Sequence, residues 1–210
     1  SIESPFPFRS GVPLPSRGET AAMKRNPIAD AWLVLVLAMG FGASLAGVQA
    51  ALKPRIEANK LSDTMSQVPL LVPQAQRGER MLVADAPVYR AVDAAGAPVG
   101  WVVPASGQGF ADRIELLIGL DAAAARITGL YILDQKETPG LGDNITTERW
   151  RKQFAGKPAD VALQVRKGPA EAPHEIEAIT GATISSESVT AIVNAAVRRL
   201  REQLASGALH

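Results

Sequence analysis

The sequence predicts an α+β protein with a mainly antiparallel sheet flanked by helices and preceded by one transmembrane helix. Three observations lead to this fold class. Short apolar runs alternate with turn residues through the middle of the chain. The last stretch repeats its apolar residues with a helical period. Near the N-terminus, an uncharged run is long enough to cross a membrane. Sequential strands closed by a helix are typical of α+β domains with antiparallel pairing.

The composition limits the chemistry that the chain can perform. Among 210 residues there are 22 basic and 21 acidic ones, and 5% are aromatic, a balance that predicts no nucleic-acid partner. The sequence has no cysteine, and its two histidines, His174 and His210, are far apart. We therefore expect no disulfide, no metal site and no Ser-His-Asp triad, and we assign no catalytic residue. Any redox chemistry must come from an organic cofactor.

The N-terminal part of the chain divides into three segments. Residues 1–22 are rich in Pro, Ser and Gly without any period, which predicts a disordered N-terminal arm. Residues 23–53 contain the uncharged run 31–52 and predict a transmembrane anchor, because this run is longer than the apolar part of a usual signal peptide. Residues 54–80 are mixed and charged, which predicts a helical stalk and a connector.

Residues 81–210 are predicted to form the folded domain. Strands are expected at 81–83, 87–91, 99–103, 113–120, 127–133 and 161–165. A helix is expected from Ser186 to Leu204, since one apolar stripe runs along it through Val189, Ile192, Val193, Ala196, Val197 and Leu200. Ser185 or Ser186 is the expected N-cap, with Glu187 in the first turn.

The segment Thr180-Gly181-Ala182-Thr183 leads into this helix. Gly181 permits close backbone approach, and a helix start offers free N–H groups and a positive dipole end to a phosphate. The same residues also fit an ordinary glycine loop before a capped helix, and local physical chemistry alone favours that interpretation.

The span from Glu177 to Thr183 resembles the flavinylation motif of the FMN-binding domain family, which occurs in the G subunit of the Rnf complex and in the C subunit of the sodium-translocating NADH:quinone reductase. The resemblance implies that a separate flavin transferase esterifies the phosphate of FMN to Thr183. It also implies that Thr180, Gly181 and Ala182 contact this cofactor. The family motif usually begins with Asp, whereas Glu177 is one methylene longer.

A second segment resembles the Glu-Thr-Pro-Gly-Leu-Gly loop of the same family and directly follows a predicted strand. The resemblance implies FMN contacts from all six of its residues, which are Glu137, Thr138, Pro139, Gly140, Leu141 and Gly142. Pro139-Gly140 suits the central positions of a type II turn. Taken alone, this pair would indicate only a common surface turn, and the side chain of Glu137 or Thr138 could either touch the ring or stabilise the turn.

Two further stretches, together with the single anchor near the N-terminus, extend the resemblance over nearly all of residues 23–205. Gly109 to Ile114 is similar to the family's Gly-Tyr-x-x-x-Ile segment, and the stretch from Trp150 to Lys157 is similar to its Trp-x-x-x-Phe-x-Gly-Lys segment. For Trp150 and Phe154 we expect core packing rather than flavin contact. The length of the chain favours the Rnf protein over its counterpart in the quinone reductase.

The resemblance implies a non-autonomous, electron-transferring subunit of a membrane-bound ion-translocating ferredoxin:NAD oxidoreductase, with covalent FMN as redox relay. Implied partners are the other membrane and cytoplasmic subunits and the flavin transferase. The implied place is the bacterial inner membrane with the domain on the periplasmic side, which is adopted from the family because basic residues lie on both sides of the uncharged run. Alternatives are the C subunit of the quinone reductase, a non-redox membrane scaffold, and a stand-alone flavin reductase.

Overall fold

In the computed structural model, residues 27–83 and 86–207 are described. The chain divides into two compact units, residues 1–52 and residues 53–210. Helix α1 (Pro27–Leu71) contributes to both of them. The predicted disordered arm, residues 1–22, lies outside the described part of the chain.

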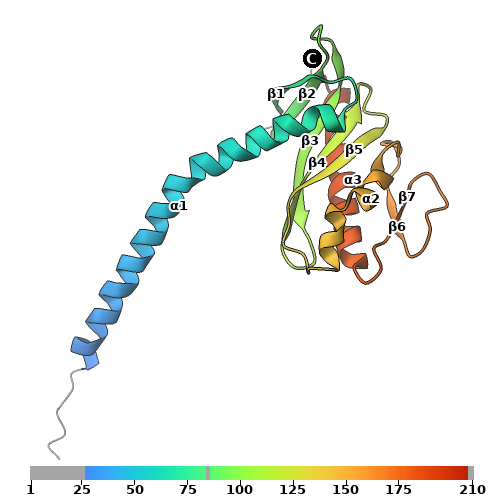
Figure 1. Ribbon diagram of the computed structural model, residues 1–210. Coiled ribbons are helices and arrows are strands. Elements are labelled where there is room, and N and C mark those ends of the chain that lie inside the picture. Colours follow the sequence, from blue (N-terminus) through green and yellow to red (C-terminus); the bar gives the residue numbers. More distant parts are fainter. Residues whose placement is uncertain (1–26, 84–85, 208–210) are drawn as a thin grey trace, which may run out of the picture. The chain divides into compact units, whose positions relative to one another are not determined.

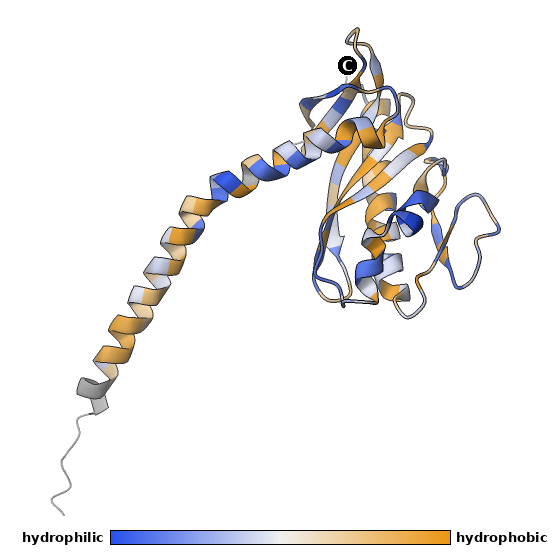
Figure 2. Ribbon diagram, in the orientation of Figure 1, coloured by the Kyte–Doolittle hydropathy of each residue, from blue (hydrophilic) through white to orange (hydrophobic). Residues whose placement is uncertain are grey.

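The first half of α1 is apolar and exposed. From Trp32 onward its large apolar side chains, such as Met39 and Phe41, are open to the surroundings. Figure 2 shows this half as a largely hydrophobic helix and the part that follows as more hydrophilic. Within the described residues, α1 is the one helix whose length and composition would allow it to cross a membrane. The predicted helix is confirmed, and the membrane crossing itself stays a prediction.

Five strands form one antiparallel sheet in sequential order. The strands are β1 (Arg77–Val83), β2 (Ala86–Val92), β3 (Pro98–Gln108), β4 (Arg113–Asp121) and β5 (Ile127–Asp134). The expected antiparallel α+β architecture is therefore confirmed. Because β1 begins at Arg77, the sheet includes the end of the segment that we expected to be a connector.

The C-terminal half supplies the remaining elements. They are η1 (Gly142–Thr146), α2 (Glu148–Arg151), η2 (Lys152–Phe154), β6 (Gln164–Arg166), β7 (Glu175–Glu177) and α3 (Thr183–Ala205). The strand expected at 161–165 is wrong for its first half, since β6 begins at Gln164. The backbone of Leu163 is hydrogen-bonded instead to the side chain of Asn194 on α3, which accepts its N–H at 2.8 Å and donates to its carbonyl at 2.9 Å. Strand β6 pairs in parallel with β7, a pairing that we did not predict.

The sheet has an apolar core on each face. Helix α3 packs against one face through the predicted stripe, including Val189, Val193 and Leu200, and meets Leu116 and Ile118 there. The end of α1 packs against the other face through Val68 and Leu71, together with Val72, which directly follows the helix (Figure 1). A sheet that is covered on both faces buries most of its apolar side chains, which stabilises the domain.

Glycines in the strands let the end of α1 approach the sheet closely. A Cβ atom on Gly119 would lie 2.6 Å from the carbonyl oxygen of Leu71, and one on Gly100 would lie 2.6 Å from Cγ1 of Val72. The hydroxyl of Thr128 donates to the same Leu71 carbonyl at 2.5 Å, which satisfies one of the free carbonyls at this helix end. The backbone of these strands therefore lies in direct contact with the end of α1.

Candidate functional site

The N-terminus of α3 carries no capping side chain. The helix begins at Thr183, and its N-cap residue is Ala182. The predicted cap at Ser185 or Ser186 is therefore wrong, and the first turn holds no acidic residue. The hydroxyl of Ser186 instead accepts the N–H of Ile179 at 3.0 Å and donates to the carbonyl of Ala182 at 3.1 Å. The N–H groups of the first turn thus remain available to an anion.

The loop before α3 turns sharply at Gly181. Its φ of 81° is in the left-handed region, where glycine is favoured. The N–H of Ala182 donates to the carbonyl of Ile179 at 2.9 Å and closes this turn. A Cβ atom on Gly181 would lie 3.1 Å from Cδ2 of Leu141, so the loop before α3 touches the second predicted segment. The fold thereby brings together two motifs about 40 residues apart in the sequence.

The second segment forms the predicted type II turn. The N–H of Leu141 donates to the carbonyl of Thr138 at 3.2 Å, and Gly140 has a φ of 75° at the third position of the turn. The side-chain amide of Asn144 donates to the carbonyls of Gly140 and Leu141 at 3.2 and 3.0 Å. The turn after β5 is therefore held in one conformation, with Pro139 at its second position.

Glu137 lies beneath both loops, with only 4% of its surface exposed. Its carboxylate accepts a hydrogen bond from the hydroxyl of Ser185 on α3 and another from the backbone N–H of Ala111, the latter at 3.1 Å. Gly109 and Gly142 leave the space that the carboxylate and the Ser185 hydroxyl occupy, since a Cβ atom on either glycine would collide with this group. Three segments therefore meet at one buried side chain.

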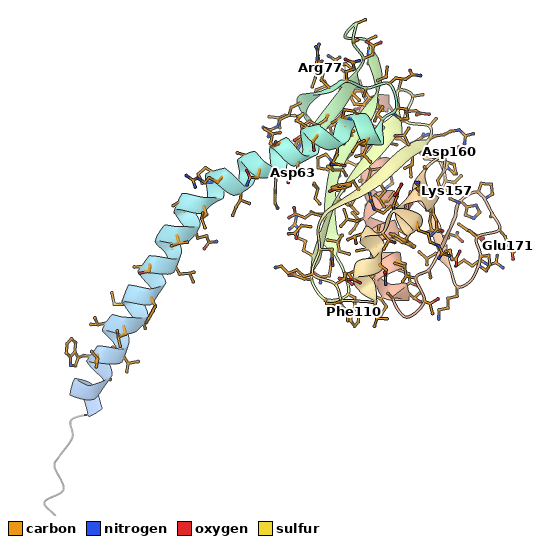
Figure 3. The ribbon with its side chains drawn as sticks, viewed as in Figure 1. Asp63, Arg77, Phe110, Lys157, Asp160 and Glu171 are labelled. Carbon is orange, nitrogen blue, oxygen red and sulfur yellow. The ribbon has the colours of Figure 1, made fainter. Side chains whose placement is uncertain are left out.

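Three large apolar side chains are exposed around this buried group. Phe110 is 59% exposed, Leu141 45% and Ile184 53%. Figure 3 shows Phe110 at the edge of the domain. Each of the three directly precedes a residue that contacts Glu137, namely Ala111, Gly142 and Ser185. Exposed apolar side chains on a structured loop cluster are typical of a binding surface for an apolar or planar group.

An exposed pair of charged residues neighbours Glu137 and Ala111 in the sequence. Lys136 and Asp112 form an exposed ion pair with 3.1 Å between Nζ and Oδ2. The backbone N–H of Arg113, followed by the Lys136 ammonium, lowers the pKa of Asp112, and the hydrogen bond that Lys136 donates to Asp112 raises the pKa of Lys136. Both groups therefore stay charged near neutral pH.

Trp150 and Phe154 lie in the core, as expected, and not at the surface of the candidate site. Both are buried, and their rings meet edge to face with centroids 5.2 Å apart. Trp150 also donates its indole N–H to the carbonyl of Glu177 at 2.9 Å, and the side chain of Gln153 accepts the N–H of Glu177 at 2.8 Å. The backbone of Glu177, where the flavinylation motif begins, is thus held from the core, while its side chain is exposed.

Some residues of this site could not be found from the sequence. Ser185 was considered only as a cap, and Ile184 and Phe110 were not assigned to cofactor binding. Ser185 and Glu137 are 48 residues apart, and no spacing rule joins them. Among the described residues, no group of three or more His, Asp or Glu side chains could hold a metal ion.

The residues present fit FMN. An FMN molecule carries a charged phosphate at one end and a planar isoalloxazine ring at the other. The uncapped start of α3 suits the phosphate, and the exposed Phe110, Leu141 and Ile184 suit the ring. Gly140 and Gly181 add no side chain of their own to the two loops.

The fold and the site together define a class of protein. Residues 109–198 match the sequence profile of the FMN-binding domain. The matched stretch contains all three segments that meet at Glu137.

Individual relatives carry more specific names. The G subunit of the ion-translocating oxidoreductase complex of Methanosarcina acetivorans is 39% identical over 110 residues, which are 52% of this chain and 55% of that protein. The G subunit of the Na⁺-translocating ferredoxin:NAD⁺ oxidoreductase complex of Acetobacterium woodii is 42% identical over 107 residues, 49% of this chain and 50% of that protein. The C subunit of the Na⁺-translocating NADH-quinone reductase of Pasteurella multocida is 36% identical over 118 residues, 53% of this chain and 45% of that protein. The chain spans about half the length of the curated relatives it matches.

Proposed function

We propose that this chain is the electron-transferring G-type subunit of a membrane-bound ion-translocating ferredoxin:NAD oxidoreductase, and that it carries FMN esterified through its phosphate to Thr183. The observation that carries the proposal is the joining of two motif loops, one around Gly140 and one before Thr183, at the uncapped start of α3. The names of the relatives support the assignment to this kind of complex.

The residues around Thr183 are suited to a phosphoester. Its hydroxyl is on the first residue of α3, where backbone N–H groups and the helix dipole favour negative charge. In the ester, the Thr183 oxygen is bonded to the phosphorus of FMN, so the chain gains the mass of FMN less one water. Attachment at the phosphate leaves the ring free to take up and release electrons, which is the chemistry that a bound flavin supplies.

The exposed apolar residues give the ring a place on the protein. Phe110, Leu141 and Ile184 are held on three different segments, and each can cover part of a planar aromatic group. The domain then needs no general acid, general base or substrate pocket of its own. We further propose that α1 anchors the domain on the periplasmic side of the inner membrane. There the phosphoester to Thr183 prevents loss of the cofactor.

A fluorescent gel tests the covalent link. The full chain is produced together with the flavin transferase, denatured, separated by electrophoresis and viewed under ultraviolet light. We expect a fluorescent band for the unchanged chain and a dark band of equal protein content for Thr183→Val. In mass spectrometry, the peptide that contains Thr183 should be heavier than the unmodified peptide by the mass of FMN less one water.

Thr146→Val is the control, because Thr146 is an exposed threonine on η1, whereas Thr183 is the half-buried first residue of α3. It should leave the band fluorescent. Fluorescence that survives in Thr183→Val, or an unmodified Thr183 peptide from a fluorescent chain, would disprove the assignment.

The C subunit of a sodium-translocating NADH:quinone reductase is the second candidate, since a relative with that name is 36% identical to part of this chain. A mild-detergent purification from the native host separates the two, because the accompanying proteins differ between the complexes. A chain purified from that host without any flavin would instead favour the non-redox scaffold.

A further inference from the structure

We infer that Glu137 is a positioning residue: its buried carboxylate ties together the three segments that carry Phe110, Leu141 and Ile184, and so sets the surface on which the flavin ring rests. The inference rests on the proposed function, because it concerns the ring of the same FMN. It assigns Glu137 a role inside the protein rather than a direct contact with the ring.

Hydrogen bonds at the Glu137 carboxylate define two of the three connections. One oxygen accepts the N–H of Ala111, which fixes the loop that carries Phe110. The other oxygen accepts the hydroxyl of Ser185, which fixes the first turn of α3 and hence Ile184. A carboxylate is suited to this work because it accepts on both oxygens, and hydrogen bonds to a charged group are stronger than those between neutral groups.

Close packing provides the third connection. A Cβ atom on Gly142 would lie 2.9 Å from Cβ of Glu137 and 2.8 Å from the hydroxyl oxygen of Ser185. The backbone after Leu141 therefore passes directly over the carboxylate and its partner. Leu141 in turn lies against Gly181 in the loop that precedes Thr183. One buried group thus links the ring surface to the residue proposed to hold the phosphate.

Burial makes this link sensitive to change. Glu137 and Ser185 are 4% and 2% exposed, and no salt bridge to Glu137 is found within the described residues. Its two hydrogen bonds therefore compensate for the water that the carboxylate loses. Removing one of them leaves a buried polar atom without a partner, which weakens the whole cluster.

The ion pair between Lys136 and Asp112 also links the segments of Glu137 and Ala111, and it provides a matched control. Lys136 and Asp112 directly neighbour Glu137 and Ala111 in the sequence, and their ion pair is exposed. An exposed pair contributes little to holding two loops together. If a change near these loops were enough to disturb the ring, Asp112→Asn would act like a change at Glu137. Our inference predicts that it does not.

The experiment uses the full chain, produced with the flavin transferase and purified in detergent, as Glu137→Ala, Glu137→Gln, Ser185→Ala and Asp112→Asn. Because Thr183 is intact, the purified Glu137→Ala chain should still carry FMN. In the folded chain, however, its flavin fluorescence should rise toward the value of the denatured chain, and its midpoint potential should shift toward that of free FMN. Glu137→Gln should restore part of both readouts, since its amide oxygen still accepts the Ala111 N–H. Asp112→Asn should match the unchanged chain.

Amide exchange of the flavin-free chain tests the link without the cofactor. Peptides covering 109–112 and 183–186 should exchange about tenfold faster in Glu137→Ala. In this variant the hydrogen bonds to the Glu137 carboxylate are absent, so local opening costs less free energy. Ser185→Ala should affect the second peptide more than the first, and it serves as the milder variant if Glu137→Ala does not fold. Equal exchange in all variants, or an unchanged flavin spectrum and potential in Glu137→Ala, would overturn the inference. If the unchanged chain carries no flavin but the exchange differs as expected, the proposed function fails and the buried link stands.

Discussion

Thr183 owes its suitability for a phosphate to the residue before it. Ala182 is the N-cap of α3 and has no side chain that can accept hydrogen bonds from the helix. A serine or aspartate in its place would bind the free N–H groups itself, as N-cap residues usually do. Ser186, which could have served this purpose, bonds to Ile179 and Ala182 instead. The chain thus shapes the loop with a serine and leaves the helix end open.

At the same scale, Trp150 supports the motif from within the core. Trp150→Phe removes the donor to the Glu177 carbonyl and should lower the free energy of unfolding by about 1–3 kcal/mol, measured by urea denaturation. It should also slow the appearance of the fluorescent band, because the loop from Glu177 to Thr183 loses one of its supports.

Trp101→Phe is the matched control for that change. Trp101 is equally buried and also donates its indole N–H to a backbone carbonyl, that of Ala122 at 3.2 Å, but it lies in β3, away from the motif. It should cost similar stability and leave flavin attachment at the normal rate. Equal rates in both variants would show that Trp150 has no special part in the motif.

At the scale of elements, the approach of α1 to the sheet depends on missing side chains. Gly119 in β4 faces the backbone of Leu71, which cannot move without moving the helix end. Gly129 in the neighbouring β5 faces mainly the end of the Leu71 side chain, which can rotate away. The two glycines therefore differ in how well they tolerate a methyl group.

Gly119→Ala should consequently lower the free energy of unfolding by about 1–3 kcal/mol, as overpacking usually does. Gly129→Ala should cost less than about 1 kcal/mol, since a Cβ atom there would lie 3.1 Å from a mobile methyl group. Urea denaturation of both variants measures the difference. A Gly129→Ala variant that is as unstable as Gly119→Ala would contradict the account of this contact.

At the scale of the whole molecule, the apolar cores lie entirely in the second unit, residues 53–210. One of these cores includes Val68, Leu71, Val72 and Ala75, although they are part of, or closely follow, the helix whose first half is exposed and apolar. The stalk expected from the sequence is therefore partly a structural element of the domain.

Two truncated chains test this division. Residues 53–210 produced alone should remain monomeric without detergent and unfold cooperatively, because no core residue is lost. Residues 73–210 should aggregate, since Ala91, Val102 and Leu117 lose the helix that covers them. Size-exclusion chromatography and thermal unfolding measure both outcomes. A soluble, equally stable shorter fragment would show that the end of α1 is not part of the domain's core.

Local patterns in the sequence were enough to predict the antiparallel strands, the apolar stripe of α3, the uncharged half of α1 and the type II turn at Pro139-Gly140. Each of these depends on periodicity or on the φ preference of a few neighbouring residues, so it can be recognised without the rest of the chain. The FMN-binding motifs could also be recognised because their residues are contiguous.

Only the tertiary structure decided where long-range hydrogen bonds override the local preference for a strand or a helix cap. Leu163 bonds to Asn194 instead of continuing a strand, and α3 begins at Thr183 because Ser186 bonds backward to the loop instead of capping the helix. The buried contact between Glu137 and Ser185 joins residues far apart in the sequence. Such choices depend on which groups become neighbours once apolar burial has brought the segments together, and no short window of sequence contains both partners.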